Sequence, residues 1–284
     1  MSLRLSPPLA ASPDALPEIV GLLERVFPRA RPWAPDVEWQ YLRNPAGPAR
    51  YVNAYGESGA LIAHYAVAPT PPLADPPLAF RSTYFSLNTA VDPTAQVPGL
   101  MVATGRALFR QLQAEGPTII LGVANENSFQ GFVRVLGFRS LGRLSLTVHP
   151  PSTLPRPAAP RALAHDPAHL RWRTSRPGVV AYADPGPGAV TVRLRHLGLP
   201  LDAVLSAGLP SDSVAGLGLA SPAAWAPRLY AGFGGPAGGL RVPDRLRPSP
   251  LEYIVRVLGD AAWADPTAAH LAARRFEFLD FDVV

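Results

Sequence analysis

Strand and helix patterns alternate through the centre of the chain, and this alternation constrains the fold more than any other feature. A strand pattern at 80–91 leads through a short loop to a helix that starts at Leu100. A short buried strand at 118–123, a helix closed by Gly137 and a strand pattern at 138–148 follow. Because a crossover helix places its two strands side by side in parallel, the sequence predicts an α/β unit with a parallel central pair.

The segments before this unit predict a helix and a hairpin. Apolar residues at helical spacing indicate a helix over 12–27, and residues 50–55 and 60–67 flank a four-residue turn. Aromatic residues lie between them: Trp33, Trp39 and Tyr41 could line a ligand pocket or serve as buried anchors.

The segments after the unit predict a second, smaller α/β domain. Residues 149–160 contain five prolines and are the best linker candidate, which divides the chain into domains 1–148 and 161–284. The patterns beyond the linker predict strands at 178–182, 189–196, 214–219, 251–258 and 276–283, and helices at 201–209 and 225–230.

The composition excludes several kinds of chemistry. The chain of 284 residues has no Cys, and all 26 of its basic residues are Arg, so thiolate nucleophiles, Cys-ligated zinc, Schiff bases and Walker A loops are excluded. We expect no metal. The net charge is +5, but the Arg residues are scattered, which argues against a nucleic-acid partner. Without an apolar run of membrane-spanning length or a signal-peptide pattern, we expect a cytoplasmic protein that does not bind membranes.

The loop before the helix at Leu100 could bind phosphate, since free backbone amides and the positive helix end meet there. An ordinary strand–helix connection is the alternative on this feature alone. The loop Gln96-Val97-Pro98-Gly99-Leu100-Met101 matches the first and fourth positions of the Q/R-x-x-G-x-G/A motif, and Asn125-Glu126-Asn127-Ser128 is followed by Gly137-Phe138. In their order and spacing, residues 12–148 resemble the GNAT superfamily of acetyl-CoA-dependent N-acyltransferases.

The resemblance implies a fold and a cofactor site. It implies a mixed, mostly antiparallel sheet with splayed parallel central strands, and it suggests that the C-terminal domain is a degenerate second GNAT-like unit. The backbone of Thr89, Ala90 and Val91 would bind the pantetheine arm of acetyl-CoA. The resemblance also implies a loop that cradles the pyrophosphate and two polar residues near the pantetheine, which are Gln96, Val97, Gly99, Leu100 and Met101 in the loop and Asn125 and Ser128 after the next strand.

Two departures from the family concern the loop and the catalytic acid. Met101 replaces a small residue and should crowd the phosphates, and Val133 stands where many relatives carry the Tyr that protonates the leaving thiolate. For a general base we single out His64 and Tyr84, with structural packing as the alternative for each.

The resulting expectation is an acyl-CoA-dependent transferase, with acetyl-CoA as the donor and an unidentified amine as the acceptor. The alternative is a non-catalytic acyl-CoA-binding or interaction protein on the same fold. A homodimer stays open as a further partner.

Overall fold

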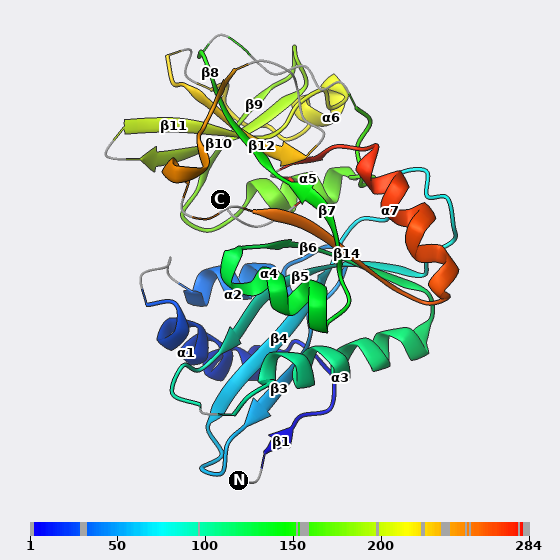
Figure 1. Ribbon diagram of the computed structural model, residues 1–284. Helices are drawn as coiled ribbons and strands as arrows, with labels where there is room; N and C mark the ends of the chain where they lie inside the picture. The colour runs from blue at the N-terminus through cyan, green and yellow to red at the C-terminus, as the bar shows by residue number, and fades with distance from the viewer. Residues whose placement is uncertain are drawn as a thin grey trace.

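Two β-sheets, stacked one above the other in Figure 1, organise the protein. The computed structural model describes residues 3–28, 33–95, 97–151, 153, 159–196, 199–222, 225–233, 239–247, 249, 251–277 and 279–280. The eight-stranded sheet has the order β1-β3-β4-β5-β6-β14-β7, with β2 paired to β3. The seven-stranded sheet has the order β13-β8-β12-β11-β10-β9, with β15 paired to β12. We call the parts around these sheets the N-terminal lobe and the C-terminal lobe.

The N-terminal lobe combines the first sheet with helices on both of its faces. Its strands are β1 (Arg4–Leu5), β2 (Leu9–Ala10), β3 (Arg50–Tyr55), β4 (Leu61–Pro69), β5 (Ser82–Val91), β6 (Thr118–Ala124), β7 (Arg139–Arg143) and β14 (Glu252–Leu258). Its helices are α1 (Leu16–Val26), α2 (Trp33–Leu42), α3 (Leu100–Glu115) and α4 (Glu126–Gln130), which continues as a π-helical turn, Gly131–Val135. α7 (Ala264–Ala272) packs beside β14 and β7.

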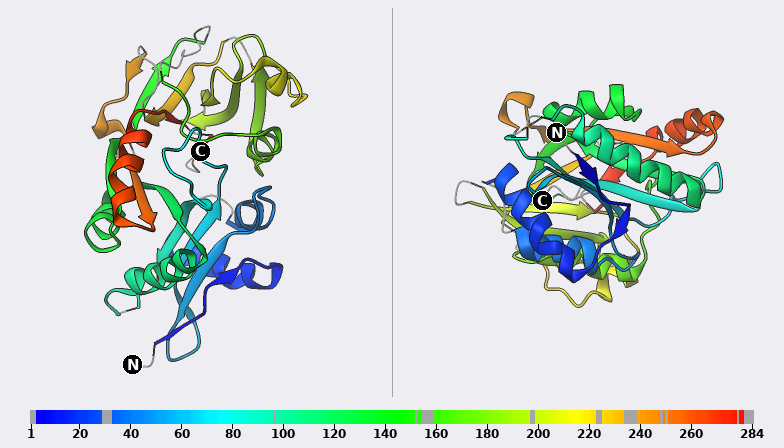
Figure 2. Two further views of the ribbon diagram at one scale, coloured as in Figure 1. Left: turned by 90° about the vertical axis from the view of Figure 1, so that its right-hand side faces the viewer. Right: turned by 90° about the horizontal axis from the view of Figure 1, so that it is seen from below.

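The C-terminal lobe is built around the second sheet. Its strands are β8 (Ser145–His149), β9 (Val180–Asp184), β10 (Ala189–His196), β11 (Leu199–Ser206), β12 (Arg228–Phe233), β13 (Leu240–Arg241) and β15 (Phe276–Glu277), and its helices are α5 (Pro167–Thr174) and α6 (Ser211–Ala215). In Figures 1 and 2, β1 lies at the end of the molecule remote from this lobe, and α5 lies on the side of the lobe that faces α2.

Alternating side chains give the first sheet two covered faces. Tyr51 of β3 and Ala66 of β4 pack with α1 and α2, whereas their neighbours Val52 and Tyr65 pack with α3. This period of two is the consequence of a pleated strand buried on both sides. The predicted hairpin is confirmed as the antiparallel pair β3–β4.

The two sheets exchange one strand each. The predicted single strand at 138–148 is wrong: the chain breaks at buried Leu144, so that β7 ends in the first sheet and β8 begins in the second. Reciprocally, the chain leaves β13 in the second sheet and enters the first as β14, between β6 and β7. The division into 1–148 and 161–284 therefore does not follow the sheets, because β8 and β14 each belong to the sheet of the other segment.

The C-terminal lobe repeats the strand arrangement of the N-terminal lobe. Each sheet contains one parallel pair, β5–β6 in the first and β11–β12 in the second, and the exchanged strand lies on the far side of β6 and of β12. The predicted second, GNAT-like unit is confirmed in its fold. Its predicted helices at 201–209 and 225–230 are wrong, because these segments form the central strands β11 and β12, and the strand predicted at 214–219 overlaps the end of α6.

Candidate active site

The parallel strands β5 and β6 separate in the middle of the first sheet. They pair from Ser82 with Thr118 to Phe85 with Leu121, although β5 continues to Val91 and β6 to Ala124. Over its whole length β6 remains paired with β14 on its other side. The carboxyl ends of the two strands therefore diverge, and this is the place where ligands bind in open α/β sheets.

A bulge in β5 lies beside this separation. Asn88 has a φ of 48°, and the β4–β5 register advances two residues on β4, from His64 to Ala66, against three on β5. The Asn88 Nδ2 donates to Gln40 Oε1 at 2.7 Å, which holds the bulge against α2. Beyond the bulge, Ala90 and Val91 pair with β4 on one edge of β5. The other edge of β5 faces β6, with which it no longer pairs.

A loop stabilised from within connects β5 to α3. The Asp92 carboxylate accepts hydrogen bonds from Thr94 Oγ1 at 2.7 Å and from the Thr94 amide at 3.0 Å, and Arg25 lies 3.1 Å away. These bonds, with Thr94 contributing most, lower the pKa of Asp92. The Ala95 amide also donates to the Asp92 carbonyl at 3.0 Å, so the loop is ordered by its own acidic residue.

The first turn of α3 offers uncapped amides. Gly99 is the N-cap residue with a φ of +79°, no side chain caps the helix, and a Cβ at Gly99 would meet nothing within 4 Å. Within the described part of the chain, the amides of Leu100 and Met101 have no hydrogen-bond partner in the helix or its cap. Open space, free donors and the positive helix end fit a phosphate group.

The other predicted loop residues differ in what the structure says of them. Val97 is half-buried near Leu100, and Gln96 lies outside the described residues. Met101 packs on the turn that begins at Gly131, since its Sδ would be only 3.4 Å from a Cβ on that residue.

Asn125 follows β6 and starts α4. Its Oδ1 accepts hydrogen bonds from the amide and the hydroxyl of Ser128, both at 3.0 Å. Both residues lie at the carboxyl end of β6, as the resemblance requires. The turn that follows carries no hydroxyl: Phe132 is buried against Tyr65, Phe109 and Phe138, and Val133 packs against the same cluster.

His64 has the environment of a structural histidine. It is 1% exposed, its Nδ1 donates to Asn53 Oδ1 at 2.6 Å, and its Nε2 accepts from the Tyr41 hydroxyl at 2.8 Å. Burial lowers the pKa of His64 to about 3, so the ring is neutral at neutral pH. With both nitrogens occupied, the geometry does not support the role of general base that the sequence suggested.

Acid should destabilise the protein through His64. The unfolded chain protonates this ring near pH 6.5 and the folded protein only near 3, so the unfolded state binds more protons between these values and stability falls as pH falls. His64→Gln should cost about 1–3 kcal/mol at neutral pH and flatten this acid slope. Urea unfolding of the unaltered protein and the variant between pH 6.5 and 3 measures both effects. If the free energy of unfolding fell equally with pH in the two proteins, His64 would not be the group responsible.

Tyr84 lies far from the loop that follows β5. It is buried near the start of β5, where it pairs with Pro69 of β4 and with Ile120 of β6. Seven residues separate it from Val91, which is roughly 23 Å along a strand. Tyr84 packs with the α3 cluster, on the face of β5 opposite Phe85, which is the environment that its alternative role in structural packing requires.

The equivalent separation in the C-terminal lobe is filled by the chain itself. β11 and β12 pair from Asp202 with Arg228 to Val204 with Tyr230, and beyond this point β15 pairs with β12. The Leu279 amide donates to the Leu205 carbonyl at 2.8 Å, so this C-terminal segment contacts both diverging strands.

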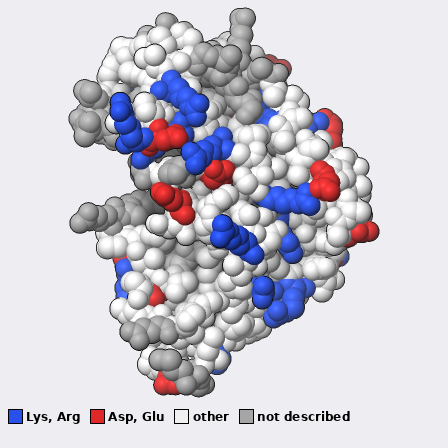
Figure 3. Space-filling view, in the orientation of Figure 1, with Lys and Arg blue, Asp and Glu red and all other residues white. Residues whose placement is uncertain are grey.

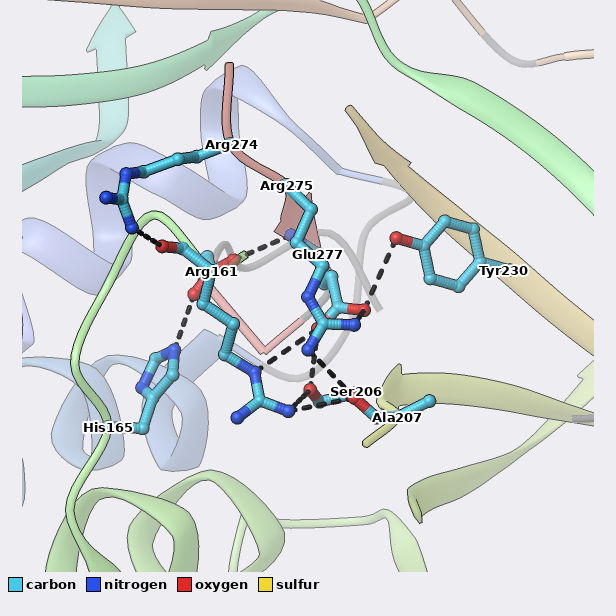
Figure 4. A network of polar contacts seen from close by, with 9 residues as sticks. Arg161, His165, Ser206, Ala207, Tyr230, Arg274, Arg275 and Glu277 are labelled. Atoms are coloured by element: carbon cyan, nitrogen blue, oxygen red, sulfur yellow. Dashed lines mark hydrogen bonds and ion pairs between the residues drawn. The ribbon is translucent and has the colours of Figure 1, made fainter. Parts of the chain in front are cut away.

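A buried polar network anchors the segment (Figure 4). Glu277 is 1% exposed and accepts hydrogen bonds from Ser206 Oγ at 2.6 Å, Arg275 Nη1 at 3.2 Å and Tyr230 OH at 3.3 Å. Among the described residues, β15 and Leu279 therefore occupy the place beyond the second parallel pair, whereas no described strand pairs between the ends of β5 and β6.

Structural comparison places this arrangement among known folds, although no protein-family model and no curated protein matches the sequence. A conserved protein of unknown function from Enterococcus faecalis V583, described as a "Probable N-Acyltransferase", aligns with a TM-score of 0.58 and 11% identity over 91% of this chain and 73% of that chain. The chain has the GNAT fold. GCN5-related N-acetyltransferases from Anabaena variabilis and Kribbella flavida align with TM-scores of 0.56, at 11% and 12% identity. They cover 90% and 96% of this chain and 73% and 74% of theirs.

The described residues contain neither a membrane-spanning helix nor a cluster of metal ligands. None of the described helices is long and apolar enough to cross a bilayer, and no group of three or more acidic or histidine side chains in the described part could hold a metal ion. On the face drawn in Figure 3, Arg side chains alternate with acidic ones rather than forming one basic stripe.

A small cavity between the lobes was not foreseen from the sequence. It has a volume of about 30 Å³ and lies between α2, β5, α5 and the C-terminal segment. Its polar lining includes Gln40, His169, Arg173 and Asp280. These residues are far apart in the sequence and form no motif, so only the packing of the lobes could bring them together. Trp39 and Tyr41 are buried anchors beside it, and the Trp33 side chain lies outside the described residues.

Proposed function

We propose that the protein is an acyl-CoA-dependent N-acyltransferase, with acetyl-CoA as the expected donor and an amine as the acceptor. The observation that carries the proposal is the end of β5–β6 pairing at Phe85 and Leu121, next to an α3 whose N-cap residue, Gly99, leaves its first amides uncapped. The C-terminal lobe contains no such opening among its described residues, since β15 fills the corresponding place.

In this proposal the residues of the N-terminal lobe hold the donor. The backbone of Thr89, Ala90 and Val91 binds the pantetheine arm, with Asn125 and Ser128 beside it. Amides of the loop and of the first turn of α3 bind the pyrophosphate; the residues assigned are Gln96, Val97, Gly99, Leu100 and Met101. The donor supplies an activated thioester, and a backbone amide near the bulge polarises its carbonyl oxygen.

Calorimetric titration of the whole chain with acetyl-CoA, with CoA as the comparison, tests the donor site. We expect micromolar binding of acetyl-CoA. Free thiol release from acetyl-CoA in the presence of a panel of primary amines tests the transfer itself. Failure to bind either compound would overturn the proposal.

Gly99→Val should weaken acetyl-CoA binding at least about 10-fold. A β-branched side chain strains the left-handed backbone and enters the open space above the loop. Gly59→Val is a matched control, because Gly59 has a φ of +78° and equally open surroundings in the β3–β4 turn. Both variants should lose similar stability, but only Gly99→Val should lose affinity; equal affinities would remove the phosphate from this loop.

A non-catalytic acyl-CoA-binding protein is the second candidate. It is favoured by the absence of a hydroxyl side chain at Phe132 and Val133, where a catalytic acid would lie in the GNAT arrangement. This candidate predicts micromolar binding of acetyl-CoA without thiol release by any amine, which the same two measurements distinguish from transfer.

A further inference from the structure

The cavity between the lobes adjoins the point at which β5 and β6 separate. Phe85, the last residue of β5 that pairs with β6, lines the cavity together with Leu87. Their neighbours Tyr84 and Ser86 lie on the other face, in contact with the α3 side of the sheet. The cavity is therefore on the face of β5 opposite α3, beside the bulge at Asn88, and an acceptor in it could approach the diverging strands.

Two residues that line this cavity each have a buried polar atom without a partner. Gln40 is 2% exposed and His169 is 5% exposed, and neither Gln40 Nε2 nor His169 Nδ1 has a hydrogen-bond partner among the described residues. A buried polar atom without a partner costs about 1–3 kcal/mol, and so such atoms indicate a bound water or ligand group. A cavity of about 30 Å³ can hold a group of that size, such as an amino group that donates to His169 Nδ1.

His169 is held neutral by its surroundings. Burial, followed by the neighbouring His165 and Arg173, lowers its pKa well below the ordinary value, while a hydrogen bond with the Leu279 backbone acts in the opposite direction. Nδ1 is the ring nitrogen without a partner, so the bond to the Leu279 backbone is assigned to Nε2. The lone pair of Nδ1 therefore remains available. The ring is therefore neutral at neutral pH, and its Nδ1 lone pair is free to accept a hydrogen bond or a proton from a group in the cavity.

A second histidine and a carboxylate lie behind His169. The His165 ring centroid is 4.7 Å from that of His169, and His165 Nε2 lies 2.5 Å from Asp280 Oδ1. Asp280 is fixed in turn, because its Oδ2 accepts from the Glu277 amide at 2.6 Å. The segment that fills the slot of the C-terminal lobe thus also orients the polar group at the cavity.

We propose that His169, supplied by the C-terminal lobe, is the general base that deprotonates an amine acceptor in this cavity; the assignment rests on the proposed acyl transfer. The acceptor ammonium gives one proton to His169 Nδ1. The neutral amine then attacks the thioester carbonyl carbon, a C–N bond forms and the C–S bond breaks. The CoA thiolate takes the second proton of the attacking nitrogen, and the imidazolium returns its proton to solvent. His165 and Asp280 are positioning residues.

The residues that line the cavity indicate which class of amine it could accept. Besides its polar residues, which also include Asn44 and Thr70, the cavity is lined by apolar ones such as Leu87, Leu163 and Leu279. A small site with these apolar walls fits a compact primary amine with an aliphatic end, which must lose its proton before it can react.

The test compares two small amines with the whole chain and acetyl-CoA. Ethylamine is protonated at neutral pH and needs a base, whereas hydroxylamine is neutral and does not. For His169→Gln we expect kcat/KM with ethylamine to fall about 100-fold, and with hydroxylamine to stay within about 3-fold after subtraction of the rate without protein. His169→Asn provides a second variant if the Gln side chain disturbs folding.

His149→Gln is the matched control. His149 is also buried in the C-terminal lobe, with its Nε2 2.9 Å from Thr147 Oγ1, but it does not line the cavity. It should leave the ratio between the two amines unchanged.

Each result bears on one of the two proposals. Equal losses with both amines would mean a structural role, and unchanged rates with both would mean no role; either overturns the base assignment and leaves the transferase standing. Acetyl-CoA binding without transfer to either amine by the unaltered protein overturns the acceptor site. If the unaltered protein does not bind acetyl-CoA, the proposed function itself is overturned.

Discussion

Residues 1–150 produced on their own should remain unfolded, although they carry every motif that resembles the GNAT family. This fragment lacks strand β14, which lies between β6 and β7 and pairs with both. Its residues Tyr253, Ile254, Val255 and Leu258 are 0–2% exposed, so their loss would open the first sheet and its core. We expect no cooperative urea transition from 1–150, whereas the whole chain should unfold in a single transition because its sheets share strands.

A rearranged chain supplies the control. Arg143 and Glu252 are paired at the adjoining ends of β7 and β14, so residues 1–144 can be joined to 251–260 through an Asn-Gly turn that forms a hairpin. This chain should regain a cooperative transition. A cooperative transition from 1–150 itself would contradict the requirement for β14, and failure of both chains would show that the C-terminal lobe is also needed.

The sequence predicted the order of elements well where local signals were strong. The β3–β4 hairpin, α3, β6 and the cap of α4 at Asn125 follow from turn residues and apolar periodicity. The described residues assigned to the donor site directly follow or end β5 and β6, because the assignment used short segments adjacent to predicted strands.

The wrong predictions concern segments whose structure is determined by tertiary packing rather than by local sequence. Residues 201–209 read as a helix, but Ala203, Val204 and Leu205 are buried on both faces of a central strand, and a continuous apolar run fits either structure. The change of sheet at Leu144 has no local signal, since a strand that crosses between sheets has the composition of one long strand. His169 could not be predicted as a site residue because its partners come from remote segments.

Trp39→Ala should destabilise the protein by about 3–5 kcal/mol, the range for loss of a buried Trp. Trp39 of α2 is 2% exposed and stacks on Trp172 of α5, with ring centroids 4.5 Å apart. Each indole also donates to the other residue's carbonyl, at 3.0 Å from Trp39 and 3.1 Å from Trp172. Urea unfolding measures the loss, and Trp225→Ala, at a residue 63% exposed, should change stability by less than about 0.5 kcal/mol.

Because Trp39 and Trp172 contact each other, their contributions to stability should be coupled. If the two tryptophans stabilise the protein mainly through each other, Trp39→Ala already removes what Trp172 contributes, and the double variant should cost less than the sum of the single ones by about 0.5–1.5 kcal/mol. Additive losses would mean that each indole acts through other contacts. Because this pair joins α2 to α5 beside the cavity, the single variants should also separate Gln40 from His169, so transfer to ethylamine should fall while acetyl-CoA binding in the N-terminal lobe persists.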